Sequence, residues 1–289
     1  MSAKPKLLYS LKSLMMTDRQ GSYISQRDRH KLMLLFVHKL WELGYKIPTI
    51  FNLKSKHIAA IVDAWKSENI SNGTLKNRLS VIRRLSHLIN KPEIVSSNKG
   101  LGISNRIYVP VKNKALHHPN FEKIMHPYLR VSLELQRVFG LRREESLKIK
   151  PHLADGGNEL KLHASWCKGG RSRVVPIQTE EQRYWLEKAK EIAGKFGNSL
   201  IPPDKNYIQH RYLYDKQVIR AGLKNLHGLR HAYAQKQYKE LTGWEAPING
   251  GPTSKQLTPE QKEIDYQARM ILSELLGHSR VQILRNYLA

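Results

Sequence analysis

The apolar residues of this chain are spaced for α-helices over most of its length, and this spacing constrains the fold more than any other feature. Between residues 23 and 91 they recur at intervals of three and four, which places them along one face of a helix. The pattern predicts three helices there, and the first ends where Gly44 and Pro48 interrupt it. The third begins after Ser-Asn-Gly-Thr at 71–74, a small polar sequence that can cap it.

Residues 159–177 depart from the helical spacing. Apolar and polar side chains alternate over residues 160–167, and a Gly-Gly pair then turns the chain into a second apolar run. Alternation with a period of two is typical of strands with one buried face, so the stretch predicts a β-hairpin. By this period Lys168 follows the apolar face, so its side chain could point toward the body of the domain instead of toward bulk water. We therefore expect a mainly α fold with a small β-hairpin or sheet.

Lysine and arginine together number 49, against 24 aspartate and glutamate residues, so the formal net charge is +25. The cations are spread along the whole chain, which predicts an extended electropositive surface that displaces counterions from a phosphate backbone. An anionic membrane is the rival partner. However, no apolar stretch approaches the roughly 20 residues that a membrane-spanning helix needs, and the N-terminus lacks the apolar core of a signal peptide. We therefore expect a cytoplasmic, nucleoid-associated protein with no membrane partner.

The length and the changes of composition along the chain predict an arm followed by two domains. Residues 1–22 are polar and basic with few apolar anchors, so they are expected to form a flexible basic arm. A helical domain is expected over 23–108 and a second domain over 109–289. Residues 92–112, rich in Asn, Ser, Gly and Lys, are typical of an interdomain linker. Residues 242–258 are rich in Gly, Pro and polar side chains and predict a surface loop.

Three arginines, Arg78, Arg83 and Arg84, lie among the apolar positions of the third predicted helix, on its outer faces. They are either part of a solvated helix surface or contacts to backbone phosphates. The net charge of the chain leaves both interpretations open.

The second domain holds a series of candidate site residues. In Gly-Leu-Arg-Arg-Glu-Glu at 140–145, Arg142 opens a short helix and could present its planar guanidinium to a phosphate, while Glu145 could orient it. Taken alone, this is only a charged helix. Lys168 beside the hairpin turn is either solvated or, if it points inward, able to donate a proton to a leaving oxygen.

His227, Arg230 and His231 share one face of a predicted helix in Leu-His-Gly-Leu-Arg-His at 226–231. The two histidines have the spacing of zinc ligands, but Gly228 stands where a zinc protease needs Glu, and no third ligand is evident. The single cysteine, Cys167, excludes an internal disulfide and a Cys-rich zinc site. We therefore expect no metal, and a buried capping histidine is the structural alternative.

Tyr287 lies nine residues after His278, which follows Leu-Leu-Gly at the end of a predicted helix. A phenol attacks phosphorus well only if its proton is removed and fixed donors meet the charge of the transition state. The two arginines, the lysine and two histidines could supply those functions without a metal ion.

In this order, these motifs resemble the tyrosine recombinases, or phage-type integrases. The resemblance is carried by Gly-Leu-Arg142 with Glu145, by Cys-Lys168-Gly-Gly in the hairpin, by the run at 226–231, and by Leu-Gly-His278 followed by Tyr287. It implies a helical core-binding (SAM-like) domain over 23–108 and a mostly helical catalytic domain over 109–289, which together clamp a DNA duplex.

The resemblance also implies a function for each residue. Tyr287 would be the nucleophile that forms a 3′-phosphotyrosyl link, and Arg142 and Arg230 would hold the nonbridging oxygens. Lys168 would protonate the departing 5′ oxygen. His227 would assist proton transfer, and His278 would hydrogen-bond the phosphate. Supporting positions are Glu145 and His231, and the expected DNA contacts are Arg78, Arg83, Arg84, Arg171 and Arg173.

The function implied is that of a site-specific DNA recombinase, an integrase of a bacterial or phage mobile element. It needs no cofactor, because the phosphotyrosyl link conserves the bond energy. Its partners would be a double-stranded recombination site and further copies of itself, which form a tetramer on DNA. A topoisomerase-like strand passer and a non-cutting architectural or regulatory DNA-binding protein are the alternatives. Two features depart from the family pattern: 47 residues separate Arg230 from His278, which predicts an insertion at 242–260, and only two residues follow Tyr287.

Overall fold

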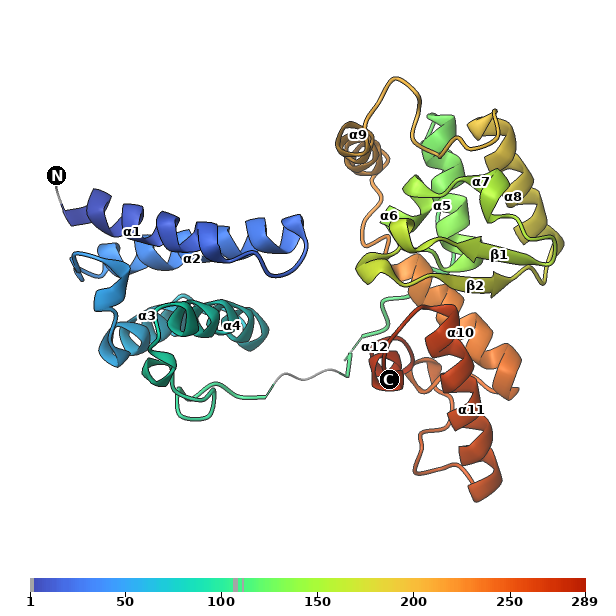
Figure 1. Cartoon of the computed structure of the whole chain (residues 1–289). Coiled ribbons are helices and arrows are strands. Elements are labelled where there is room, and N and C mark those ends of the chain that lie inside the picture. The colour runs from blue at the N-terminus through green and yellow to red at the C-terminus, as the bar shows by residue number, and fades with distance from the viewer. Residues whose placement is uncertain (1–2, 106–108, 111) are drawn as a thin grey trace. The chain divides into compact units, whose positions relative to one another are not determined.

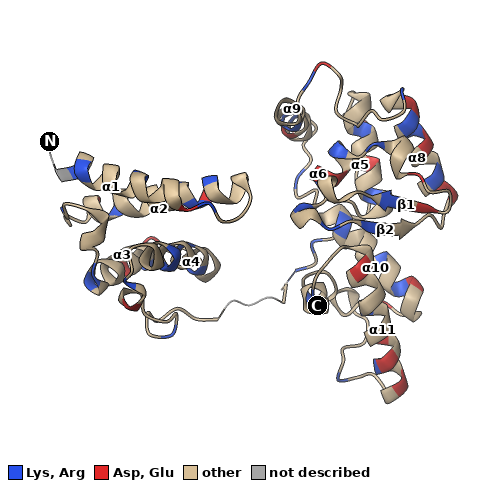
Figure 2. Cartoon of the chain, viewed as in Figure 1, with Lys and Arg blue, Asp and Glu red and all other residues tan. Residues whose placement is uncertain are grey.

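The computed structural model describes residues 3–105, 109–110 and 112–289. The chain divides into two compact units, Met1–Ile107 and Tyr108–Ala289 (Figure 1). Both are built mainly from helices, and the one sheet among the described residues has two strands. The expected mainly α fold with a small hairpin is confirmed. Lysine and arginine residues occur on helices of both units (Figure 2), as the spread of charge along the sequence predicts.

The first unit is a bundle of helices around an apolar core. Its elements are α1 (Ala3–Thr17), α2 (Tyr23–Glu42), η1 (Ile50–Asn52), α3 (Ser55–Ser67), α4 (Asn72–Leu88) and η2 (Pro92–Ile94). The three helices predicted between residues 23 and 91 are present. Ser22 and Ser71 cap α2 and α4 by accepting a hydrogen bond from the backbone three residues on.

Helix α1 replaces the flexible arm that the composition of residues 1–22 predicts. Leu7, Leu11 and Met15 occur at intervals of four and are buried in the core of the first unit. Burying each such side chain stabilises the fold by about 1.5–3 kcal/mol, enough to hold a helix whose remaining surface is polar and basic. The prediction of an arm is therefore wrong for residues 3–17, because three apolar anchors suffice.

The expected linker at 92–112 also differs from the prediction in its first part. Ile94, Val95 and Ile103 are buried against the first unit. Arg83 on α4 donates hydrogen bonds to the Ser96 carbonyl and the Asn98 side chain, which hold this segment on the helix. Residues 106–108 and 111 of the predicted linker lie outside the described residues.

The second unit carries the candidate site. Its helices and strands are α5 (Pro127–Phe139), α6 (Arg143–Lys148), α7 (Pro151–Ala154), β1 (Glu159–Leu162), β2 (Arg173–Pro176), α8 (Glu180–Ala193), α9 (Tyr207–Arg220), α10 (Gly228–Thr242), α11 (Pro259–Leu275) and α12 (Arg285–Leu288). Helix α5 packs against α6, α8 and α10, and α10 packs in turn against α11 and α12. A buried apolar cluster from these elements forms the core, and the C-terminal helix α12 belongs to it.

The predicted hairpin is present but shorter than its sequence pattern suggests. Strands β1 and β2 pair antiparallel, with Leu160 opposite Val175 and Leu162 opposite Arg173. The alternating residues that follow do not continue the strand, because two 3-10 turns, η3 (Ala164–Trp166) and η4 (Lys168–Gly170), occupy this stretch. Lys168 therefore lies on an exposed turn, so of its two alternative positions the structure has the solvated one.

The insertion at 242–260 is an ordered part of the second unit. It contains the 3-10 turn η5 (Pro247–Asn249), which packs against α12. Ala246 and Leu257 are buried, so the expected surface loop has an apolar underside. Within the described residues, no helix combines the length and the apolar character that crossing a bilayer requires.

Candidate active site

Five segments of the second unit meet at the candidate site: the turn after α5, the start of α6, the start of α10, the end of α11, and α12. Gly140 ends α5 with a positive φ of 61°, and a Cβ there would lie 2.4 Å from the Tyr233 ring. Only glycine fits this position. Its carbonyl oxygen accepts a hydrogen bond of 2.6 Å from Arg230 Nη1, so the turn directly positions one of the two site arginines.

Arg142 lies at the N-cap position of α6 and is held from two sides. Glu145 Oε1 accepts a hydrogen bond of 2.7 Å from Arg142 Nη1, and Glu145 Oε2 accepts one of 2.7 Å from the Arg142 backbone N–H. The carbonyl oxygen of Leu276 accepts a further bond of 3.1 Å from Arg142 Nη2. The Arg142 side chain is about three-quarters buried, with 23% exposed.

Arg173 completes the support of Glu145. Its guanidinium donates two hydrogen bonds, of 2.8 and 2.7 Å, to the two Glu145 oxygens, and a third to the Leu275 carbonyl. Burial alone would raise the pKa of the Glu145 carboxyl. The hydrogen bonds and charge of Arg173, with the charge of Arg142, outweigh it and lower the pKa to about 2. The expectation that Arg173 contacts DNA is therefore corrected: only 5% of its side chain is exposed, and it braces the site from inside.

Arg230 on α10 is buried, with 1% of its surface exposed. Besides Gly140, it donates to the Leu276 carbonyl, and its Nη2 lies 3.4 Å from His278 Nε2. Burial lowers the pKa of Arg230 to about 10, although a tyrosinate charge at Tyr287 would act in the opposite direction. The guanidinium consequently stays charged at neutral pH.

Tyr287 lies in the site of its own chain. Arg230 Nε donates toward its Oη over 3.4 Å, and His227 Nε2 lies 3.4 Å from the same oxygen. The rings of His231 and His278 flank the phenol, with centroid distances of 4.4 and 5.4 Å. Helix α12 presents this side chain to the arginines although Arg230 and Tyr287 lie 57 residues apart in sequence.

The three histidines around Tyr287 are neutral at pH 7. Burial lowers the pKa of each: that of His278 to about 3 and that of His231 to about 4, and that of His227 also falls below its usual value. The charges of Arg230 and Arg142 add to this effect at His227 and His278. His227 and His231 pack edge to face with ring centroids 5.4 Å apart. The described residues include no group of three or more His, Cys, Asp or Glu side chains placed to hold a metal ion.

The structure thus brings together Arg142, Glu145, His227, Arg230, His231, His278 and Tyr287. Lys168 and Arg171 do not join them: both lie exposed on the loop between the strands, and neither side chain bonds to another described residue. Sequence reasoning missed the bracing position of Arg173 and the Leu276 carbonyl that both arginines share. Neither of these two features can be recognised from neighbouring residues in the sequence, because each depends on contacts between residues far apart in the chain.

The three arginines expected to bind DNA from α4 are engaged within the first unit. Arg78 lies over the Trp65 ring, with its Cζ atom 4.6 Å from the centroid. Arg84 forms an ion pair of 3.0 Å with the buried Asp18, and Arg83 holds the segment after η2. All three are half-buried, so a structural function is established for each, and their DNA contacts remain predictions.

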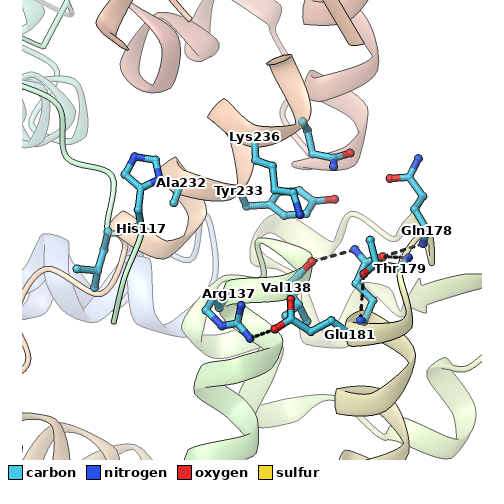
Figure 3. A pocket seen from close by; sticks show the side chains of 12 residues that line it. His117, Arg137, Val138, Gln178, Thr179, Glu181, Ala232, Tyr233 and Lys236 are labelled. Carbon is cyan, nitrogen blue, oxygen red and sulfur yellow. Dashed lines mark hydrogen bonds and ion pairs between the residues drawn. The ribbon is translucent and has the colours of Figure 1, made fainter. Parts of the chain in front are cut away.

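The second unit also has a small cavity of about 130 Å³ (Figure 3). His117, Tyr233 and Lys236 contribute to its wall, together with an ion pair of 2.6 Å between Arg137 and Glu181. Neither Tyr287 nor any of the six residues gathered around it lines this cavity. Tyr287 and Arg230 are buried, whereas His227 reaches the surface and 23% of the Arg142 side chain is exposed, so the site opens to solvent at these two residues.

Comparison with known proteins agrees with this geometry. Residues 4–94 match the family described as "Phage integrase, N-terminal", and residues 111–236 match the family described as "Integrase". No curated protein matches the chain in sequence.

Two solved structures share the fold. The Tn1549 transposon integrase (residues 82–397) in complex with circular intermediate DNA has a TM-score of 0.56 and 12% identity, over 100% of this chain and 95% of that one. The XerH site-specific recombinase bound to palindromic difH substrate has a TM-score of 0.58 and 16% identity, over 96% of this chain and 80% of that one.

The fold and site define an integrase-type enzyme of DNA strand exchange. The chain belongs to the tyrosine recombinase, or phage integrase, family of site-specific DNA recombinases. The cleavage chemistry of that family is the formation of a phosphotyrosyl intermediate.

Proposed function

We propose that Tyr287 is the nucleophile of this recombinase and that it acts in the site of its own chain. The observation that carries the proposal is the position of its Oη, 3.4 Å from both Arg230 Nε and His227 Nε2. In the reaction, a bond forms between Oη and the phosphorus while the bond from phosphorus to the 5′ oxygen breaks. The phosphate remains attached through its 3′ oxygen, so no external energy source is needed to rejoin the strand.

Each of the remaining site residues has a separate role in this phosphoryl transfer. Arg142 and Arg230 donate to the nonbridging oxygens, where negative charge grows in the transition state. His227 takes the phenol proton, which its neutral state allows because burial lowers the pKa of its ring. His278, also neutral, donates a hydrogen bond to the phosphate. His231 supports the phenol by packing against its ring.

Lys168 gives its proton to the departing 5′ oxygen in this scheme. It lies on the exposed turn η4, at the end of the short hairpin, where a DNA duplex can reach it. The two glycines that follow have positive φ values of 75° and 67°, a conformation that side chains with a Cβ rarely adopt. We therefore assign the hairpin loop, with Lys168 and Arg171, to the surface that meets the DNA.

The partner we propose is a double-stranded recombination site. Support comes from the formal charge of +25 and from the two similar structures, one in complex with circular intermediate DNA and the other bound to palindromic difH substrate. Strand exchange joins two duplexes and requires four cleavages, so we further propose that four copies of the chain assemble on the DNA. The first unit serves as the core-binding domain and the second as the catalytic domain.

Capture of the covalent intermediate tests the nucleophile. A recombination-site duplex nicked close to the cleavage position loses the short strand that would rejoin, so the phosphotyrosyl link accumulates and can be seen as a DNA-dependent shift in denaturing electrophoresis. The wild-type chain should form the adduct. Tyr287→Phe should form none, with nearly unchanged DNA affinity, since one hydroxyl contributes little to a large electrostatic interface.

The matched control is Tyr266→Phe, which removes the hydroxyl of an exposed tyrosine on α11. Adduct persisting in Tyr287→Phe would refute the assignment. Tight DNA binding by the wild type without any adduct would favour the non-cutting alternative, and relaxation of supercoiled plasmid without strand exchange the topoisomerase-like one.

A further inference from the structure

The main chain of Tyr287 is held by a side chain that the proposed chemistry does not use. Gln235, two turns after the start of α10, is buried, with 2% of its surface exposed. Its Nε2 donates a buried hydrogen bond of 2.9 Å to the Tyr287 carbonyl oxygen. Helix α10 thus hydrogen-bonds to the tyrosine at both its hydroxyl, through Arg230, and its backbone, through Gln235.

Gln235 is itself fixed by two asparagines from distant segments, Asn113 before α5 and Asn249 in η5. Asn113 Oδ1 accepts a bond of 2.9 Å from Gln235 Nε2. Gln235 Oε1 accepts bonds of 3.2 Å from both Asn113 Nδ2 and Asn249 Nδ2. Asn113 Nδ2 also donates to Asn249 Oδ1 over 2.6 Å. These three side chains, which we call the amide ring, leave Gln235 no freedom to turn away from Tyr287.

The insertion is shaped to present Asn249 to this ring. Gly250 follows it with a φ of 88°, and a Cβ on Gly251 would lie 1.7 Å from the Glu245 carbonyl oxygen. Both positions therefore demand glycine. The Gly251 N–H donates to the Ala246 carbonyl over 3.1 Å, and buried Ala246 anchors the turn on the core. Asn249 lies within the insertion expected at 242–260, so the insertion contributes one of the three side chains of the amide ring.

Helix α12 needs such support because it is only four residues long, Arg285–Leu288. A helix this short is not stable by itself, since helix formation gains little before several turns are closed. Yet the phenol must stay within hydrogen-bonding reach of both His227 and Arg230. A fixed point at the Tyr287 carbonyl restricts how far the side chain can move.

We infer that the amide ring is a clamp that positions Tyr287 for attack in the site of its own chain, and that the insertion contributes to recombination by supplying Asn249. The inference rests on the proposed nucleophile. Asn113, Gln235 and Asn249 are positioning residues, because they act through α12 and touch no reacting atom.

Single-turnover cleavage of the nicked duplex at saturating DNA gives the first test. Gln235→Ala and Asn249→Ala should cleave about 10- to 100-fold more slowly, because displacement of a reacting group by about 1 Å can cost ~10²-fold in rate. Their DNA affinity should match that of the wild type. Gln235→Glu should be no better than Gln235→Ala, since a carboxylate cannot donate to the Tyr287 carbonyl. Gln237→Ala is the control: Gln237 is buried on the same helix but bonds to Glu240.

Amide hydrogen exchange of the free protein gives a second test that needs neither DNA nor cleavage. Residues 285–289 should exchange faster in Gln235→Ala and Asn249→Ala, with the rest of the second unit unchanged. Thr253→Ala is the control within the insertion, because Thr253 bonds only to Gln256 there. If Gln235→Ala speeds exchange throughout the second unit, the Asn249→Ala variant alone tests the clamp. Asn249 is exposed, so its replacement leaves the core intact.

The outcomes separate the two ideas. Slower cleavage together with faster exchange confined to 285–289 supports the clamp. Normal cleavage in both variants overturns it, and so does unchanged exchange at 285–289. If the wild-type chain forms no adduct on DNA, the proposed nucleophile fails, whereas the exchange measurement still shows whether the amide ring holds α12.

Discussion

Arg173 and Glu145, which lie 28 residues apart in sequence, form a buried two-bond ion pair behind the site, and Glu145 in turn holds Arg142. Arg142, which we propose to bind the phosphate, is therefore oriented by a carboxylate that is itself fixed by a second arginine. Because the pair is buried, removal of one partner leaves the other as an uncompensated charge. Such a break costs about 3–5 kcal/mol.

We therefore predict that Glu145→Gln both destabilises the second unit and slows strand cleavage. The amide cannot accept from Arg173 and Arg142 as the carboxylate does, so both guanidinium groups lose a charged partner. Thermal unfolding and single-turnover cleavage measure the two effects. Glu144→Gln is the matched control, because Glu144 forms only an ion pair with Lys148 on the surface of the same helix. Equal behaviour of the two variants would show that the buried pair is dispensable.

The same pair predicts how stability changes in acid. The pKa of Glu145 falls from its ordinary 4.5 to about 2 in the folded chain, so the unfolded chain binds the proton more readily. The stabilisation is fully present above about pH 5 and is lost as the pH falls toward 2, and over this range it amounts to about 3 kcal/mol. Unfolding free energies measured between pH 6 and 3 should fall more steeply for the wild type than for Glu145→Gln. Parallel curves would place the acid sensitivity elsewhere.

The two site arginines should be essential to cleavage and poorly replaced by lysine. Arg142→Ala and Arg230→Ala should each slow adduct formation by several orders of magnitude, because a preorganised donor to developing charge contributes roughly 3–4 kcal/mol. Lysine should restore little, since an ammonium cannot bond to two oxygens in one plane. Cleavage of the nicked duplex is the measurement, with Arg280→Ala as an exposed-arginine control. A near-normal rate in either alanine variant would remove that arginine from the site.

How far the sequence predicts this site depends on the range of the contacts. Local signals suffice for the Gly140 turn with Arg142 and Glu145 and for the face shared by His227 and Arg230, because both depend on spacing within one helix or turn. The meeting of these segments with Tyr287 follows only from the family resemblance. The function of Arg173 could not be predicted. The alternation of side chains in its strand indicates that Arg173 faces inward, but it does not indicate that Arg173 pairs there with the buried carboxylate of Glu145.

The errors of sequence reasoning have physical causes as well. Residues 3–17 form a helix because Leu7, Leu11 and Met15 align at intervals of four, a weak pattern in a polar, basic stretch. The strand after Leu162 ends early because 3-10 turns replace it, although the alternation of side chains continues. Alternation of apolar and polar residues indicates which side chains face inward. A turn that packs against the core can produce this pattern, just as a strand can.

Lys168 should act as an acid toward the leaving oxygen. We expect Lys168→Ala to be slow on ordinary DNA and to recover on a substrate whose 5′-bridging oxygen is replaced by sulfur, since a thiolate leaves without protonation. Cleavage rates on the two substrates are compared for the variant and the wild type. Lys161→Ala, on the neighbouring strand β1, is the control and should be normal on both. Equal impairment of Lys168→Ala on both substrates would show that the lysine only positions the phosphate.

Assembly should depend on DNA and should weaken steeply with salt. A formal charge of +25 makes copies of the free chain repel one another, so we predict a monomer in solution. On a recombination site, phosphates neutralise this repulsion, and adjacent half-sites raise the effective concentration of one copy for the next. Because counterion release drives the binding, the assembly constant should fall linearly on a logarithmic plot against salt. Light scattering with and without the duplex measures the species present. A stable tetramer of the free protein at moderate salt would mean that contacts between copies are strong enough to overcome the charge without DNA.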